Sequence, residues 1–173
     1  VWVGKGKEKE TIEGFFTEQL SKYQRERIQW ASCDMSETYL GAIEKNCPNA
    51  TLVLDRFHIV KALNTALDEV RKEQWRAATG AERKALKGMR WLLFKHSRNR
   101  TKGNTRVLNK LRTGNRRIHR AWILKDEFEQ VWEYVTIGPA RRFLKNWITA
   151  ALRSRLEPLK RYARTLRKHF EHV

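Results

Sequence analysis

The sequence predicts an α/β section followed by a longer all-helical section, so that the chain is mostly α-helical. Short apolar and β-branched runs alternate with amphipathic helical patterns over residues 1–55, whereas only helical patterns follow Asp55. The charge changes at the same place. Residues 1–55 hold seven Lys and Arg against nine Asp and Glu, and residues 56–173 hold thirty against ten. We therefore expect two parts, 1–55 and 56–173, of which the second is strongly basic.

The first part has the pattern of three strands and two helices. Residues 1–3 look like the end of a strand, and a glycine turn leads into an amphipathic helix over about 8–25. Strands are predicted at 28–33 and 51–54. Between them a helix over 36–46 begins at a serine suited to the N-cap and ends in Asn-Cys-Pro-Asn. Strands and helices that alternate in this way predict parallel pairing through helical crossovers.

The second part is predicted to be helical throughout. Its connection 95–103 is basic and has no apolar anchor, so we expect it to be mobile. Trp75, Trp132 and Trp147 lie at helical spacing with other apolar residues and are expected in the core, whereas Trp91 and Trp122 could be core or surface residues, with the core favoured. The predicted helices cover residues 57–78, 81–94, 104–112, 116–135, 139–153 and 158–170.

Composition narrows the class of protein. An apolar content of 40% with seven tryptophans can form a core, and no apolar run reaches the roughly 20 residues of a membrane span. There is no signal-peptide pattern, and two cysteines do not make a disulfide framework, so a cytoplasmic protein is expected. The net charge of +18 favours a polyanionic partner, above all nucleic acid. The alternative is basic character that serves solubility alone.

Two aspartates follow the predicted strands directly. Asp34 comes after 28–33, and Asp55 comes after 51–54 with His58 three residues later. The carboxyl ends of parallel strands form the edge at which open α/β sheets usually have their sites. The alternative is structural: Asp34 could cap the next helix, and Asp55 could be an N-cap to which His58 bonds locally.

Three short motifs resemble one family. Cys33-Asp34-Met35-Ser36, Pro48-Asn49-Ala50 and Asp55-Arg56-Phe57-His58 occur in this order with this spacing in the ISL-three group of bacterial insertion-sequence transposases, whose DDE catalytic domain is RNase H-like. The resemblance implies that 1–55 is part of an RNase H-like core and that 56–173 is a basic helical insertion. It implies metal-dependent DNA strand cleavage and transfer, with three carboxylates holding Mg²⁺ or Mn²⁺.

Within this resemblance Asp34 matches the second carboxylate and is the expected metal ligand. Asp55 and His58 are expected to assist catalysis, with Asp55 the weaker candidate for direct metal contact. The first Asp and the final Glu of the family have no counterpart, and Glu127 lies in a helical segment instead. We therefore expect an internal fragment that binds no metal and is inactive alone. The full-length protein is expected to act on transposon ends as a homo-oligomer, at the nucleoid when bound to DNA.

The residues expected to contact nucleic acid lie mainly in the stretch 83–120, which has fourteen Lys and Arg and no acid. A second basic face is expected on the last two helices. Two alternatives remain: a non-catalytic basic nucleic-acid-binding module, and a complete small metal-dependent nuclease. The candidates for contact are Arg90, Trp91, Lys95, Arg98, Arg100, Lys102, Arg106, Arg116, Arg117, Arg120 and Trp122.

Overall fold

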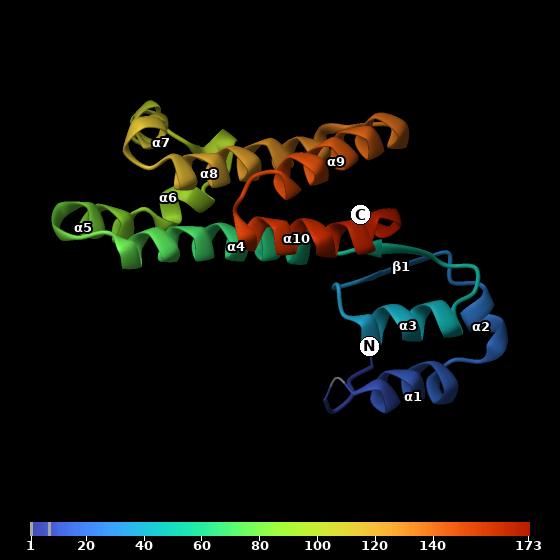
Figure 1. The fold of residues 1–173 in the computed structure, drawn as a ribbon. Helices are drawn as coiled ribbons and strands as arrows, with labels where there is room; N and C mark the ends of the chain where they lie inside the picture. The colour runs from blue at the N-terminus through green and yellow to red at the C-terminus, as the bar shows by residue number, and fades with distance from the viewer. Residues whose placement is uncertain (1, 7) are drawn as a thin grey trace. The chain divides into compact units, whose positions relative to one another are not determined.

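The structure is a computed structural model, and it describes residues 2–6 and 8–173. It is mostly α-helical with one small parallel sheet, as the sequence predicts (Figure 1). Its internal contacts divide it into two units. The first comprises the chain up to Val60 together with His169–Val173, and the second comprises Lys61–Lys168.

The first unit is layered around two parallel strands, β1 (Trp30–Cys33) and β2 (Thr51–Leu54). Helix α3 (Glu37–Asn46) packs against both strands, and α1 (Lys9–Gln19) packs against α3 (Figure 1). The short 3₁₀ helix η3 (Phe170–His172), from the other end of the sequence, contacts β2. The buried apolar side chains of this unit include Ile12, Phe16, Leu40, Ile43, Leu52 and Leu54.

The first 30 residues differ from the prediction. Trp2 and Val3 form no strand, while Val1 of the expected strand lies outside the described residues. The Trp2 ring instead packs on Phe15, with 5.0 Å between ring centroids. The single helix expected over 8–25 is two helices, α1 and α2 (Lys22–Glu26), because Leu20 is extended and Ser21 forms a capping box that starts α2.

The second unit is a set of packed helices. Helix α4 (Arg56–Ala77) begins in the first unit and runs into this one, and the helix expected over 81–94 is broken at Met89. The helix expected over 116–135 stops at Phe128 and continues as a 3₁₀ turn. The remaining elements are α5 (Gly80–Gly88), α6 (Arg90–Phe94), η1 (Ser97–Asn99), α7 (Lys102–Gly114), α8 (Arg116–Phe128), η2 (Glu129–Glu133), α9 (Ile137–Leu152) and α10 (Glu157–Lys168).

Aromatic side chains fill the centre of the second unit. Phe128 is 1% exposed and lies 4.8 Å from the ring of Trp147 and 6.1 Å from that of Tyr162. The indole nitrogen of Trp147 donates a hydrogen bond to the carbonyl of Leu124 at 2.7 Å, which satisfies its one polar group. Trp147 is therefore a core residue, as its spacing predicts, whereas Trp75 and Trp132 are only partly buried.

A buried ion pair joins α4 to α5. The carboxylate of Asp68 accepts a hydrogen bond from Arg71 Nε at 2.7 Å, and both side chains are nearly inaccessible. Arg71 also donates to the carbonyl of Leu86 at 3.2 Å, and Lys72 lies 3.1 Å from the second oxygen of Asp68. Removal of one partner would leave a buried charge without compensation.

The connection between α6 and α7 is tied down by acids from α8 and η2. Glu129 accepts hydrogen bonds from the amide and the hydroxyl of Ser97 at 3.2 and 3.0 Å, and it also binds Lys125. Arg98 pairs with Glu133, and Arg100 pairs with Asp126. The missing apolar anchor therefore does not leave this segment without tertiary contacts, because polar residues distant in sequence hold it.

Candidate functional site

The strand register places two aspartates side by side. Cys33 pairs with Leu54 at the end of the parallel ladder, so Asp34 and Asp55 are the next residues on adjacent strands. The amide of Asp55 donates to the carbonyl of Cys33 at 2.8 Å, which continues the pairing to this point. Neighbouring strands lie about 4.8 Å apart. The two backbones therefore present both aspartates at one edge of the sheet.

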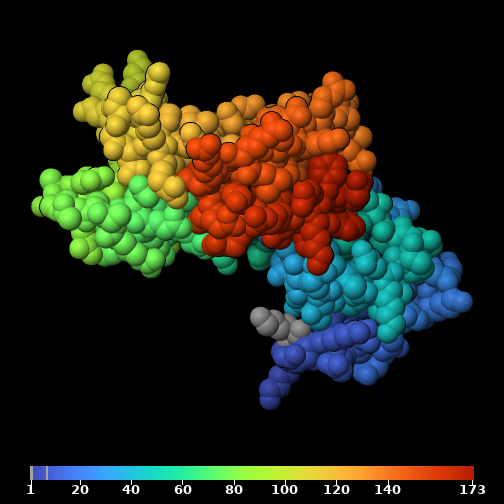
Figure 2. All heavy atoms as spheres, in the orientation of Figure 1, coloured from blue at the N-terminus to red at the C-terminus, as the bar shows by residue number. Residues whose placement is uncertain are grey.

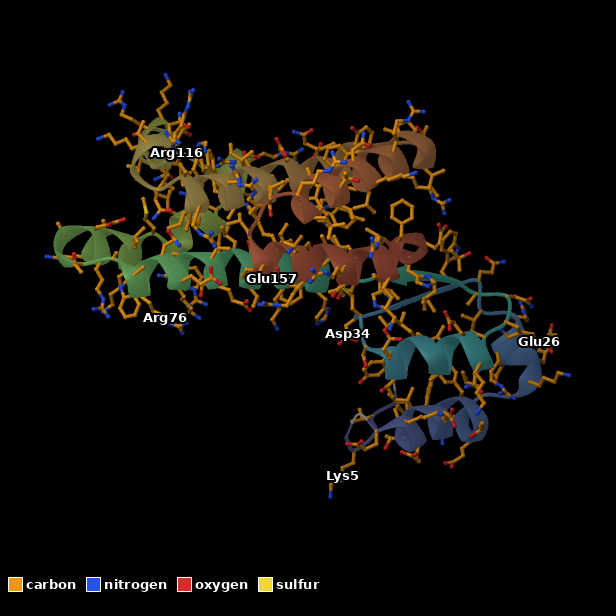
Figure 3. The ribbon with its side chains drawn as sticks, in the orientation of Figure 1. Lys5, Glu26, Asp34, Arg76, Arg116 and Glu157 are labelled. Carbon is orange, nitrogen blue, oxygen red and sulfur yellow. The ribbon has the colours of Figure 1, made fainter. Side chains whose placement is uncertain are left out.

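Asp34 lies in the turn between β1 and α3 and is partly buried (Figure 3). Its Oδ1 accepts the amide hydrogen of Ser36 at 2.9 Å, an Asx turn that leads the chain into the helix. The side chain of Ser36 makes no capping bond, so Asp34 takes over part of that function. Its Oδ2 forms no hydrogen bond or ion pair with any of the described residues, and it is the oxygen that can accept an outside ligand.

Asp55 uses both of its carboxylate oxygens locally. Oδ1 accepts the amide hydrogen of Phe57 at 2.8 Å, and Oδ2 lies 3.0 Å from Nδ1 of His58. The hydrogen bond from Phe57, and then the one from His58, lower the pKa of the Asp55 carboxyl. If His58 donates through Nδ1, its Nε2 keeps a lone pair that can accept a proton or a hydrogen bond. Asp55 thus caps the start of α4, as the structural alternative predicted, and Nε2 of His58 stays available for a hydrogen bond to a ligand.

The side chains at this edge suit a hard cation better than a soft one. Burial, and then the charge of Asp34, raise the pKa of the Cys33 thiol to about 11, so it stays protonated at neutral pH and is a poor metal ligand. Carboxylate oxygens are the ligands that Mg²⁺ prefers. Across residues 2–6 and 8–173, however, no three His, Cys, Asp or Glu side chains come together closely enough to hold a metal ion.

Exposed basic side chains of the second unit gather around α7. Lys102, Arg106 and Lys110 recur at intervals of four residues, so they share one helical face, and α7 contains no acid. Arg116, at the start of α8, is exposed beside them, and Figure 3 shows nitrogen-tipped side chains extending outward around it. Figure 2 shows the chain around α7, in yellow, at the outside of its unit.

Several other predicted contact residues are engaged within the protein. Trp122 is 4% exposed beneath the guanidinium of Arg100, whose side chain is 6% exposed, so neither is available to a ligand as they lie. Neither residue belongs to the exposed basic surface around α7. Five other predicted contact residues are at least partly exposed, but each also has a partner within the protein. The pairs are Lys95 with Asn104, Arg98 with Glu133, Arg117 with Glu73, Arg90 with Asp68 and Arg120 with the carbonyl of Ser154.

Trp91 is the one aromatic candidate at the surface. It is 71% exposed, the guanidinium of Arg90 lies 5.1 Å from its ring centroid, and the ring of Phe94 meets it edge-on at 6.0 Å. An exposed indole backed by a guanidinium is a platform on which a base can stack. The sequence favoured a core position for Trp91, and the structure places it at the surface.

Comparison with known proteins gives the family. A model of the DDE transposases of the ISL3 group, described as transposase, matches residues 1–173, the whole chain. The chain belongs to this transposase family.

Curated relatives agree with the assignment. The transposase for insertion sequence element IS1001 of Bordetella parapertussis is 29% identical over 176 residues, covering 100% of the chain and 43% of the relative. The transposase for insertion sequence element IS1557 of Mycobacterium tuberculosis is 26% identical over 192 residues, covering 98% of the chain and 43% of the relative. The chain thus spans less than half the length of these relatives. No solved structure matches it significantly.

The structure of this transposase chain also adds basic residues that the sequence argument overlooked. Lys110 and Arg112 on α7 are exposed and have no acidic partner among the described residues. The spacing of Lys110 from Lys102 and Arg106 was the signal that could have identified it.

None of the described helices is both long enough and apolar enough to cross a bilayer.

Proposed function

We propose that this chain contributes one catalytic carboxylate and a DNA-binding helical surface to a transposase that cleaves and joins DNA strands. The observation that supports this most directly is the register of β1 and β2, which brings Asp34 and Asp55 to the same edge of the sheet. Such an edge is where open α/β folds usually hold their ligands. In this proposal residues 1–55 belong to an RNase H-like catalytic core, and 56–173 form a basic helical insertion.

Asp34 is the proposed metal ligand. Its Oδ2 has no partner among the described residues, and its Oδ1 holds the turn in place through Ser36, so the carboxylate is both oriented and available. A divalent Mg²⁺ or Mn²⁺ ion, when bound, would stabilise the oxygens that attack and leave the phosphorus. Asp55 holds His58 through Oδ2, and His58 would orient a water molecule or a phosphate oxygen at that site.

The surface around α7 is proposed to hold the DNA backbone. Its exposed Lys102, Arg106, Lys110 and Arg116 lack acidic partners within the described part of the chain, so phosphates can replace their counterions. Trp91 would add stacking on an unpaired base. The full-length transposase is proposed to bind transposon ends in this way, as a homo-oligomer.

The second candidate function, a binding module without catalysis, suits the chain on its own. Two-metal chemistry needs several carboxylates at one point, and no third ligand side chain joins Asp34 or Asp55 within residues 2–6 and 8–173. We propose that the 173-residue chain binds DNA but does not nick it. Nicking of supercoiled plasmid with Mg²⁺ that is lost in Asp34→Ala would overturn this part of the proposal.

The full-length enzyme tests the catalytic assignment. Asp34→Asn should abolish strand cleavage of transposon-end DNA with little change in DNA affinity, because the amide keeps the Ser36 hydrogen bond and loses the charge. Asp55→Asn should reduce cleavage less, since both of its oxygens already have local partners. Glu10→Gln, on the exposed first turn of α1, is the matched control and should cleave normally. Cleavage retained in Asp34→Asn would make that residue a cap only.

A further inference from the structure

A cleft between α8 and α9 has a composition that points to a particular ligand. Its volume is about 730 Å³, within the range of roughly 300–1,000 Å³ typical of small-molecule sites. Its walls include three arginines, Arg120, Arg153 and Arg155, and no acid. Ile123 and Leu124 of α8 and Ala150 of α9 give it an apolar side.

Two of these arginines have side chains without a partner among the described residues. Arg153 caps the end of α9 through its backbone amide, and Arg155 lies two residues later; neither guanidinium makes a hydrogen bond or an ion pair with any residue that the structure describes. The guanidinium of Arg120 donates one hydrogen bond to the carbonyl of Ser154 at 2.9 Å. This bond holds Arg120 against the turn that contains Arg153 and Arg155. Glu157, the nearest acid along the chain, is already paired with Lys160 and Arg164.

The backbone at Arg155 is unusual. Its φ is +61°, the left-handed conformation, and Arg155 is the one non-glycine residue at positive φ among the described residues. This conformation costs an L-residue about 1–2 kcal/mol, and glycine would adopt it freely. Strained residues of this kind cluster at ligand sites, where the strain sets the direction of a side chain. Here the turn places Arg155 in the wall of the cleft, which it shares with Arg120 and Arg153.

We propose that this cleft binds a nucleotide bearing a terminal phosphate, with the dianionic phosphate against the three guanidiniums and the base against the apolar side. Planar guanidinium forks match phosphate oxygens two at a time, and three of them suit a dianionic monoester better than the single charge of an internal phosphodiester. The proposal rests on the DNA-binding function proposed above and deepens it: the ligand is the phosphorylated end of a strand or a free nucleotide.

Binding of short oligothymidylates to the 173-residue chain by calorimetry tests this. The wild type should bind the 5′-phosphorylated oligomer about tenfold or more tightly than the 5′-hydroxyl oligomer, because a charge-assisted hydrogen bond contributes about that factor. Arg155→Gly should abolish the difference without lowering Tm, since glycine relieves the strained backbone. Arg155→Lys should keep only part of it, because lysine lacks the fork.

A control outside the cleft separates this inference from general DNA binding. The double variant Arg106→Gln with Lys110→Gln on α7 should lower the affinity for both oligomers equally and leave the ratio of the two affinities unchanged. If thymidine monophosphate competes, the free nucleotide is sufficient; if only the oligomer shows the preference, the ligand is a strand end. Equal affinity of the wild type for both oligomers, an unchanged ratio in Arg155→Gly, or equal competition by inorganic phosphate would overturn the inference. Failure to bind any DNA would instead remove the proposed function.

Discussion

The two units place their candidate functional groups by different means. In the first unit, which has a net charge of −2, two aspartates gain their position from one pair of strands and its register. In the second unit, which has a net charge of +20, many cations share one helical surface and each has several neighbours of the same kind. Geometry is therefore decisive for the aspartates of the first unit and charge density for the α7 surface of the second. A single substitution of Asp34 should change cleavage, whereas a clear change in general DNA affinity should need combined substitutions on α7.

The largest expected effect concerns the charge of the second unit. DNA affinity should fall on the order of 10³-fold between about 50 and 200 mM salt if the surface meets six or more phosphates. Arg106→Gln with Lys110→Gln should reduce the salt slope by about 2, one for each lost phosphate contact. Lys9→Gln with Lys22→Gln in the first unit is the matched control and should leave the slope unchanged. An equal change in both double variants, measured by fluorescence anisotropy, would break the comparison.

Stability should depend on burial of charge in the second unit. Asp68→Ala should lower the free energy of unfolding by about 3–5 kcal/mol, because Arg71 would remain buried without its partner. The adjacent Glu69→Ala removes an exposed pair with Arg161 and should cost about 0–1 kcal/mol. Urea unfolding followed by tryptophan fluorescence measures both. Similar losses in the two variants would show that the Asp68 pair gains little from its burial.

Acid should destabilise the second unit through two carboxylates, those of Asp68 and Glu129. Burial alone would raise the pKa of Asp68 and Glu129, but hydrogen bonds from Arg71 and Lys125 respectively outweigh it, so both values are lowered. The folded state then binds fewer protons than the unfolded state. The stabilisation is complete above the ordinary values of 3.8 and 4.5 and is lost as pH falls below them.

Urea midpoints at about pH 7, 5 and 3 test this expectation. The wild type should change little between the first two conditions and should lose stability at the third. Asp68→Asn with Glu129→Gln should show a shallower fall, because neither side chain can take up a proton. A fall as steep in the double variant as in the wild type would assign the acid sensitivity to other carboxylates.

The smallest expected effect is on the free energy of unfolding, and it comes from the capping boxes of the two units. Ser21 with Gln24 and Thr101 with Asn104 each form a complete capping box. Thr101→Ala should lower the free energy of unfolding by about 1 kcal/mol, because α7 packs through its buried leucines. Ser21→Ala should cost less, since α2 buries no side chain and can fray alone. Thr101→Ser keeps the acceptor and should unfold like the wild type.

Local patterns predicted the elements whose ends have strong signals. β2 matches the predicted 51–54, and the ends of α3 and α4 agree within a residue, because aspartates, Ser36 and the Asn-Cys-Pro-Asn stop mark them. The breaks at Leu20 and Met89 were missed, since apolar periodicity continues through both. The strand predicted at residues 1–3 is wrong for Trp2 and Val3, because an apolar run gives a β signal whether or not a neighbouring strand pairs with it.

The sequence predicted which residues belong to the candidate site but not how they come together. Strand-end positions identified Asp34 and Asp55, but their adjacency depends on a register that no local pattern specifies. The burial of Trp122 depends on Arg100, and through it on Asp126, which are contacts between distant segments. The left-handed turn at Arg155 was invisible because neither Gly nor Asn marks it.

The return of His169–Val173 to the first unit has a consequence for synthesis. The 3₁₀ helix η3 contacts β2, so the unit that holds the strands also includes residues that are synthesised only after Lys61–Lys168. Residues Lys61–Lys168 form a continuous segment, and domains generally fold as units as they emerge. The basic helices should therefore reach their native packing while the acidic edge of the sheet still lacks its final contact. Of the two units, the one whose synthesis begins first is therefore completed second.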